Sequence, residues 1–435
     1  MAEANTRGKW MALLAAFLGW MFDGLEIGLF PLAGRPAMTE LIGAVGPDTD
    51  RLIGQWMSGV VAAFLLGAAV GGTVFGWLGD RVGRVRAMVF SVLTYSLFSG
   101  ACAFVQSPVQ LAALRFVASM GMGGEWALGV ALVSEIWPAK NRPLLSGLIG
   151  AAANMGFMIV GFVGLGASRF VAGLGKALAF LPLTWTEMLL RNGGWRLIFL
   201  VGALPAVLTF VIRIFVPESE KWKAATRDGR KSSIIHIFEG EIAASTYLGA
   251  CLAGVALLGT WGAVQFIPSW VQQFTGSQQK ASWTLIFQAV GASTIPIVVA
   301  LLAQKFNRRG TYAWLCIGSF VLCQALFLLY RKEPQFGFRF LLLATLVNGV
   351  TAGFYGWLPL YLPELFPTRI RATGAGFTFN AGRVIAATGT FLASGGLMSV
   401  FGSYALMGSI MCSVYLVGTI VVFFCPETKG KPLPE

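Results

Sequence analysis

Charged residues are scarce in this sequence: they make up 12% of its 435 residues, whereas 56% are hydrophobic. A soluble domain with this balance could not cover its surface with polar groups, so the composition excludes an ordinary soluble fold. Apolar runs of about twenty residues recur along the chain, and a helix of that length crosses the hydrocarbon core of a bilayer. The sequence therefore predicts an all-α protein with many membrane-spanning helices.

The sequence also lacks the residue patterns of enzymes. It has a single histidine, His236, and none of its six cysteines forms a CxxC pair, so neither a metal site nor a disulfide framework is indicated. No glycine-rich nucleotide-binding loop follows a strand, and no Ser/His/Asp spacing appears. We therefore expect neither an enzyme nor an ATP-driven pump, and we expect no cofactor.

The net charge of +13 does not indicate a nucleic-acid partner, because the basic residues lie in short loops between the apolar runs. Lys and Arg gather in the connections on one side, and the positive-inside rule places that side and both termini in the cytoplasm. We expect a multi-pass protein of a bacterial inner membrane that works as a monomer in the lipid bilayer. Its twelve spans are expected near residues 10–33, 54–79, 86–106, 109–136, 143–168, 195–216, 245–273, 280–304, 311–330, 337–362, 370–397 and 402–424.

The two parts of the chain on either side of its longest inner connection resemble each other. SEIWPAKNR at 134–142 parallels PELFPTRIR at 363–371, and PESEK at 217–221 parallels PETKG at 426–430. A repeated six-helix unit predicts a pseudo-two-fold axis along the membrane normal, with a central cavity and alternating access. We expect a first bundle over residues 1–216, a cytoplasmic linker over 217–244 and a second bundle over 245–435.

The motif GWLGDRVGRVR at 76–86 matches the signature loop between the second and third helices of the major facilitator superfamily, which the chain resembles over essentially its whole length. DGLE at 23–26 resembles the DGxD motif of the aromatic-acid:proton symporters, and GMGGEW at 121–126 resembles the sialic acid and metabolite:proton symporters. The resemblance implies a twelve-helix secondary transporter for a small organic anion. PESEKW and PETKG also resemble sugar porters, which keeps a neutral-hexose carrier as an alternative.

Charged residues recur at helix ends on the expected cytoplasmic side of both bundles. Such residues can form pairs between helices that hold one side shut and separate when it opens. Alternatively, they are ordinary positive-inside anchors. The candidate gate residues are Asp80, Arg81, Arg84, Glu135 and Arg142 in the first bundle and Glu364 and Arg371 in the second.

Two acids lie inside the first apolar run, Asp23 and Glu26, one helical turn apart. Burying an ionised acid near the bilayer centre costs roughly 2.5–3.5 kcal/mol, so such residues usually face a cavity or pair with a base. Burial and a like-charged neighbour both favour the protonated form, which would let one of them hold and release a proton. Glu125 and Arg115 of the fourth span are further candidates for proton coupling. A structural ion pair is the alternative for all four.

Arg383, inside the eleventh span, is the candidate anchor for an anionic substrate, because a buried guanidinium presents a fork of donors that matches a carboxylate. A permanent salt bridge with an acid of the first or fourth helix is the alternative. The other candidate substrate-binding residues are Asn380, Asn154, Gln265, Tyr355 and Trp357.

Together these patterns predict a secondary transporter that moves a small organic anion inward with protons. The anion could be a monocarboxylate, a sialic acid or an aromatic acid. The alternatives are a proton-coupled or facilitative hexose carrier and a receptor that uses a transporter scaffold without transporting.

Overall fold

The computed structural model describes residues 2–43, 49–177, 182–204, 207, 212, 215–227, 233–332, 334–391 and 401–435. Every regular element within these residues is a helix, which confirms the all-α prediction. The α-helices are α1 (Ala2–Ile42), α2 (Thr49–Val82), α3 (Arg84–Ala101), α4 (Pro108–Ile136), α5 (Arg142–Leu165), α6 (Ala167–Ala177), α7 (Leu183–Val201), α9 (Glu220–Ala225), α10 (Gly240–Gly262), α11 (Ile267–Thr275), α12 (Gln278–Lys305), α13 (Arg308–Leu329), α14 (Phe338–Tyr361), α15 (Arg371–Phe391), α17 (Tyr404–Cys412) and α18 (Val414–Val421).

Ten stretches of the described residues are long and apolar enough to cross a membrane, and they match ten of the expected spans. The two remaining expected spans, 195–216 and 370–397, coincide with the end of α7 and with α15. Parts of both lie outside the described residues.

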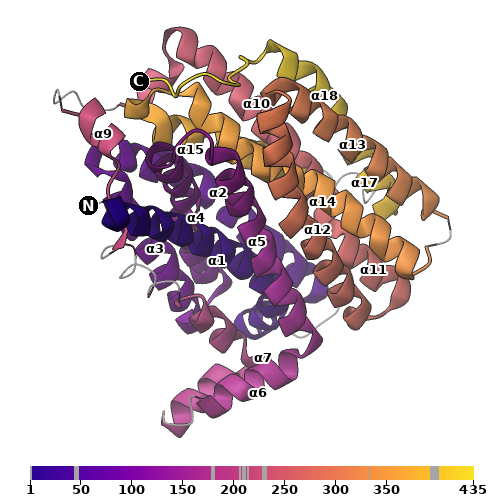
Figure 1. Cartoon of the computed structure of the whole chain (residues 1–435). Coiled ribbons are helices and arrows are strands. Elements are labelled where there is room, and N and C mark those ends of the chain that lie inside the picture. Colours follow the sequence, from indigo (N-terminus) through magenta and orange to yellow (C-terminus); the bar gives the residue numbers. More distant parts are fainter. Residues whose placement is uncertain are drawn as a thin grey trace.

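The helices form one bundle in which the first part of the chain packs beside the second. Figure 1 shows α1 to α5 in indigo and purple next to α10 to α18 in pink, orange and yellow. The two parts meet where α5 packs against α12 and α14, and where α2 packs against α15. A site between α1, α2, α5, α14 and α15 is therefore built from both parts of the chain.

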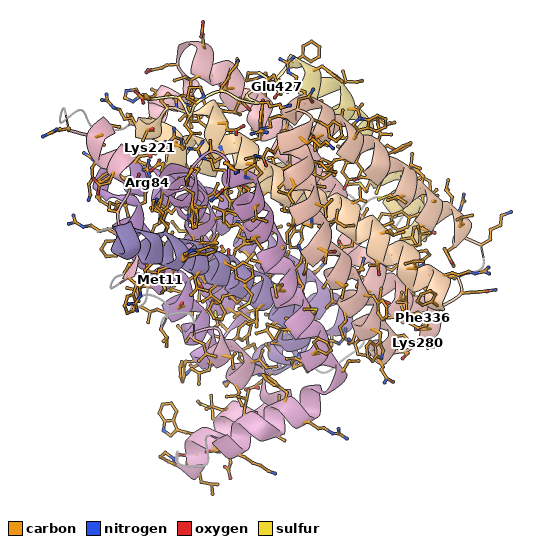
Figure 2. All side chains as sticks on the ribbon, in the orientation of Figure 1. Met11, Arg84, Lys221, Lys280, Phe336 and Glu427 are labelled. Atoms are coloured by element: carbon orange, nitrogen blue, oxygen red, sulfur yellow. The ribbon has the colours of Figure 1, made fainter. Side chains whose placement is uncertain are left out.

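The bundle has two distinct ends. Both termini and α9 lie at one end, here named the terminal face, and α6 with the first turns of α7 projects from the opposite end, named the far face (Figure 1). Figure 2 places Arg84, Lys221 and Glu427 near the terminal face and Lys280 and Phe336 at the far face. The sequence motifs assigned to a gate therefore gather at the terminal face.

The two PE motifs have the same structural role at the terminal face. Glu218, of PESEK, accepts hydrogen bonds from the backbone N–H groups of Arg84 (3.0 Å) and Val85 (3.1 Å). These are the first residues of α3, where backbone donors have no partner within the helix and the helix dipole favours an anion. The carboxylate therefore caps α3 from 133 and 134 residues away in sequence.

Glu427, of PETKG, repeats this contact in the second part of the chain. It accepts from the backbone N–H groups of Arg308 (3.0 Å) and Arg309 (3.1 Å), the first residues of α13. Burial alone would raise the pKa of Glu427, but the backbone donors around it lower the pKa below its ordinary value. The sequence parallel between the two motifs thus corresponds to a shared capping contact.

At the far face, a carboxylate of α1 holds that helix against α7. Glu40, near the end of α1, accepts hydrogen bonds from Asn192 Nδ2 (2.7 Å), Trp195 Nε1 (2.8 Å) and Arg196 Nη1 (2.8 Å). Burial alone would raise the pKa of Glu40, but the hydrogen bonds and the Arg196 charge lower it. Asn192 has a positive φ of 49°, so this contact also holds a backbone conformation that favours glycine.

We predict that Glu40→Gln lowers the melting temperature at neutral pH and that the difference from the wild type shrinks as the pH falls. Because the pKa of Glu40 is lower in the folded state, its stabilisation is present above the unfolded pKa and is lost as pH falls through the folded pKa. Thermal unfolding measured by fluorescence across a pH series tests this. Glu187→Gln, an exposed substitution at the same face, is the control, and a difference that persists unchanged at acid pH would contradict the prediction.

Candidate functional site

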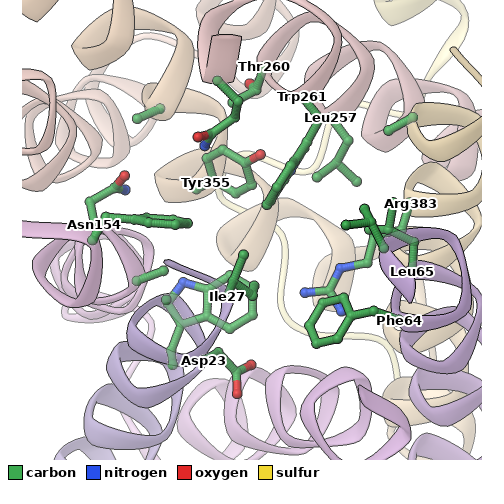
Figure 3. Close-up of a pocket in the computed structure, with 18 of the residues that line it drawn as sticks. Asp23, Ile27, Phe64, Leu65, Asn154, Leu257, Thr260, Trp261, Tyr355 and Arg383 are labelled. Atoms are coloured by element: carbon green, nitrogen blue, oxygen red, sulfur yellow. The ribbon is translucent and has the colours of Figure 1, made fainter. Parts of the chain in front are cut away.

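A central cavity lies between the two parts of the chain, lined by side chains of α1, α2, α4, α5, α10, α14 and α15. Figure 3 shows Asp23, Asn154, Trp261, Tyr355 and Arg383 arranged around it. Asp23 and Arg383 supply its charged end, whereas Tyr355 and Trp261 lie together at a neutral polar end. Other lining residues include Trp20, Phe64, Arg115, Phe157, Thr260, Gln265, Asn348 and Phe379.

Arg383 enters the cavity from α15 and is only 9% exposed. Its Nη1 donates to Asn380 Oδ1 at 3.1 Å, one helical turn earlier. Within the part of the chain that the structure describes, no carboxylate forms a salt bridge with Arg383 within 4.0 Å. A buried guanidinium without a carboxylate partner is costly, and a ligand anion would supply one.

Aromatic rings shape the charged end of the cavity. The Arg383 guanidinium lies over the rings of Phe379 (5.1 Å to the centroid) and Trp20 (5.8 Å), and Trp126 stacks on Phe379 at 3.8 Å. Cation–π contacts of this kind hold a guanidinium in place without neutralising it. The indole N–H of Trp20 is buried and has no protein acceptor among the described residues, so a second donor is available at this end.

Asp23 is 1% exposed, and neither of its carboxylate oxygens has a hydrogen-bond partner among the described residues. The charged groups acting on it are Glu125, Arg383 and Glu26. Glu125 is not among the residues that line the cavity, and it lies against α1 in a notch at Gly19. A Cβ added to Gly19 would lie 1.8 Å from Glu125 Oε1, so the glycine makes room for this carboxyl group.

Glu26 and Arg115 form a different kind of site. Arg115 Nη1 donates to Glu26 Oε1, and Ser99 Oγ donates to the same oxygen at 2.5 Å. Both charged residues are buried, at 4% and 2% exposure. The two acids of the first helix are therefore separated by the fold: Glu26 is paired, and Asp23 is not.

The terminal face is closed by a buried network centred on Asp80 of α2. Its Oδ1 accepts from Arg84 Nη1 (2.5 Å) and from the backbone N–H of Ala372 (3.2 Å). Its Oδ2 accepts from the backbone N–H (2.7 Å) and the hydroxyl (2.5 Å) of Thr373. Asp80 thus joins the end of α2 to the start of α15 in the other part of the chain.

Glu135 of α4 joins the same two parts a second time. Its Oε1 accepts from Arg84 Nη2 (3.0 Å) and from Arg371 Nη1 (3.1 Å). Arg84, Arg371 and the Glu135 side chain are fully buried, and Arg84 also donates to the carbonyl of Thr368 at 2.8 Å. Charges buried this deeply depend on one another, because removing one leaves its partner unpaired.

Residues 10–390 match the family described as the Major Facilitator Superfamily. The chain belongs to this superfamily. It is a multi-pass membrane transporter rather than an enzyme, in agreement with the prediction from its sequence. It is 28% identical to the cis,cis-muconate transport protein of Acinetobacter baylyi, over 97% of this chain and 95% of that one. It is also 28% identical to a probable 4-methylmuconolactone transporter of Cupriavidus pinatubonensis, over 96% and 90% of the two chains.

The fold of the transporter is also that of solved superfamily members. The structure of the E. coli proton:xylose symporter XylE bound to 6-bromo-6-deoxy-D-glucose superposes with a TM-score of 0.80, covering 99% of this chain and 98% of that one. At 17% identity this similarity shows a shared fold and carries no information on substrate.

Six of the residues predicted for proton coupling or substrate binding line the cavity of the transporter. The other four do not line it: Glu26 pairs with Arg115, Glu125 lies against Gly19 of α1, Asn380 accepts a hydrogen bond from Arg383, and Trp357 packs elsewhere. Trp357 is fully buried, stacks on Tyr361 at 4.4 Å and donates to the carbonyl of Arg308 at 3.0 Å. The six lining residues are Asp23, Arg115, Asn154, Gln265, Tyr355 and Arg383.

The predicted gate residues fall into two groups: some make contacts within one part of the chain, and the others join the two parts. Glu364 pairs with Arg308 (2.8 Å) within the second part of the chain. Arg142 donates to the carbonyl of Trp137 at 3.3 Å, and Arg81 is an exposed residue whose guanidinium lies over Trp77. Among the predicted gate residues, Asp80, Arg84, Glu135 and Arg371 make direct contacts between the two parts.

Trp20 and Phe379 are cavity residues that the sequence analysis did not single out. Trp20 precedes Asp23 by three residues and Phe379 precedes Arg383 by four, so each shares a helix face with a charged cavity residue. That spacing is the sequence signal that could have found them.

Proposed function

We propose that this transporter carries a small organic anion into the cell together with one or more protons. The observation that carries the proposal is the presence, in one cavity, of a base and an acid, Arg383 and Asp23, neither of which forms a salt bridge within the described part of the chain. A neutral sugar needs no fixed base, whereas an anion entering a low-dielectric cavity does. Carriage of a hexose is the alternative.

The cavity offers complementary groups for a carboxylate. The guanidinium of Arg383 supplies charge and a donor fork, and the indole N–H of Trp20 supplies a further donor. An ionised Asp23 would repel the substrate, so protonation of Asp23 or Glu125 favours binding, which couples the proton to the anion. Tyr355 and Gln265 at the neutral end can hydrogen-bond to the remainder of the molecule.

The names of the relatives support an anion. Muconate is a six-carbon dicarboxylate, and its transport protein from Acinetobacter baylyi aligns with nearly the whole chain. We extend this substrate class, small organic acids, to the present transporter.

Access to the cavity alternates by rocking of the two bundles, residues 1–216 and 245–435, around the linker 217–244. We place the terminal face in the cytoplasm of a bacterium, following the distribution of Lys and Arg. The network of Asp80, Glu135 and Arg371 then closes the cytoplasmic side and must break before the substrate can leave inward. One chain contains the whole cavity, so a monomer is sufficient for this cycle.

Uptake into proteoliposomes under an imposed pH gradient tests the proposed function. A panel of cis,cis-muconate, aromatic acids, monocarboxylates, sialic acid and hexoses should show gradient-driven accumulation of at least one acid and of no hexose. Accumulation of hexoses, without uptake of or competition by any acid, would overturn the anion assignment.

We predict that Asp23→Asn and Glu125→Gln each reduce gradient-driven uptake at least about tenfold while exchange of labelled for unlabelled substrate continues. Exchange does not require release of the proton, whereas net uptake does. A tenfold loss of uptake rate corresponds to about 1.4 kcal/mol, which is less than the free-energy cost of burying an ionised acid in the membrane. Gradient-driven uptake at the wild-type rate in both variants would show that neither acid couples proton movement to transport.

A further inference from the structure

Tyr95 of α3 carries a polar group that the proposed cycle does not yet use. The residue is 0% exposed, and its hydroxyl has no hydrogen-bond partner among the described residues. A buried hydroxyl without a partner costs free energy, so its presence needs an explanation.

The backbone places Tyr95 beside Gly121, one helical turn before Glu125 in α4. At Gly121 of α4 the two helices touch: a Cβ added there would lie 2.6 Å from the Tyr95 backbone nitrogen and 2.9 Å from its Cβ. Ser91 Oγ donates to the Gly121 carbonyl at 2.5 Å and fixes the same contact. Glu125 lies one turn further along α4. Its charge acts on the Tyr95 hydroxyl more strongly than the charges of Asp23 and Glu26 do.

The charged groups around this cluster do not replace the hydroxyl as a donor. Glu125 Oε2 is buried and has no partner among the residues that the structure describes, and Asp23 in α1 offers only another carboxyl group. The nearby base Arg115 is engaged by Glu26. Ser96, the neighbour of Tyr95 in α3, is also buried, and its hydroxyl has no partner among the described residues.

We propose that Tyr95 is a positioning residue for the coupling proton: its hydroxyl donates a hydrogen bond to the Glu125 carboxylate once that acid has released its proton. In the structure the Tyr95 hydroxyl and Glu125 Oε2 are both buried and have no hydrogen-bond partner among the described residues, so the proposed bond is not formed in this state. The proposal requires α3 to move against α4 at the Gly121 contact so that donor and acceptor meet. The inference rests on the proposed proton-coupled transport.

The test is the pH dependence of gradient-driven uptake by Tyr95→Phe in proteoliposomes, with cis,cis-muconate or the panel acid that the wild type takes up fastest. Loss of the donor makes the ionised acid less favourable, so the pH midpoint of uptake is expected to move upward by about one unit. Substrate exchange at acid pH should remain at the wild-type rate. Tyr415→Phe is the matched control, because Tyr415 is equally buried and has no carboxylate among the charged groups acting on it.

Glu125→Asp provides a second variant that does not depend on the folding of Tyr95→Phe. The shorter side chain withdraws the carboxylate from the hydroxyl, so the midpoint should again move upward, although aspartate is intrinsically the stronger acid. A midpoint equal to that of the wild type and Tyr415→Phe in the Tyr95 variant, or a downward shift in the aspartate variant, would overturn the role of Tyr95. If uptake by the wild type does not depend on the pH gradient, the proposed function itself is overturned.

Discussion

Arg383→Gln is expected to reduce organic-anion uptake by about 100-fold or more. The substitution keeps a polar side chain of similar length but removes the charge that would face the substrate carboxylate. Breaking a buried pair by removing one partner costs about 3–5 kcal/mol, and each 1.4 kcal/mol is a factor of ten. The loss should appear in both uptake and exchange, because the residue is proposed to hold the substrate rather than the proton. This pattern separates Arg383 from Asp23 and Glu125.

Two comparisons make the Arg383 experiment specific. Arg339→Gln removes the same charge from an exposed position of α14 and should leave uptake unchanged. Arg383→Lys keeps the charge but loses the planar fork, so we expect an intermediate rate with a raised KM. Exchange by Arg383→Gln at the rate of the Arg339 control would show that Arg383 does not bind the substrate.

Glu135→Gln is expected to convert the closed terminal face into a predominantly open one. The single oxygen Oε1 accepts from both Arg84 and Arg371, so the substitution leaves two buried guanidinium groups without their shared counter-charge. A penalty of about 3–5 kcal/mol on the closed state is of the size needed to reverse a two-state equilibrium. We expect the open state to escape the penalty, because opening would expose both guanidinium groups to water.

The separation of Lys140 and Gln304 reports this opening. They are exposed residues of the two parts of the chain, and Gln304 Nε2 donates to the carbonyl of Lys140 at 3.3 Å. Spin labels on cysteines at these positions should give a short distance in the wild type and a longer one in Glu135→Gln. Glu220→Gln breaks only an exposed pair with Lys223 and should leave the distribution unchanged. An unchanged distribution in Glu135→Gln would show that the network does not hold the face closed.

The helical fold and the presence of a charged cavity could be predicted from this sequence because both depend on composition and helical spacing. Apolar runs define spans whatever their packing, and Arg383 within such a run needs either a cavity or a partner. The hydrogen bond between Asn380 and Arg383 follows from their spacing of three residues on one helix. These inferences require no knowledge of how the helices are rotated.

The rotation of each helix about its own axis decides which side chains face the cavity, and this rotation could not be predicted from the sequence. Asp23 and Glu26 have similar surroundings in the sequence, but only the packed structure shows that Arg115 reaches Glu26 and leaves Asp23 unpaired. Tyr355 and Trp357 are two residues apart and so lie on nearly opposite faces of α14, which is why one lines the cavity and the other packs away from it. Because of this spacing the two side chains could not both face the cavity, although the spacing did not show which of them would.

The central claim is that anion and proton move together, and proton flux driven by the substrate tests it most directly. Proteoliposomes loaded with a pH-sensitive dye, with equal pH on both sides and the membrane potential clamped, receive the preferred acid outside. The account predicts internal acidification at the rate of anion entry, beyond that of protein-free liposomes and of liposomes containing Arg383→Gln. Anion entry through the protein without any accompanying acidification would contradict it.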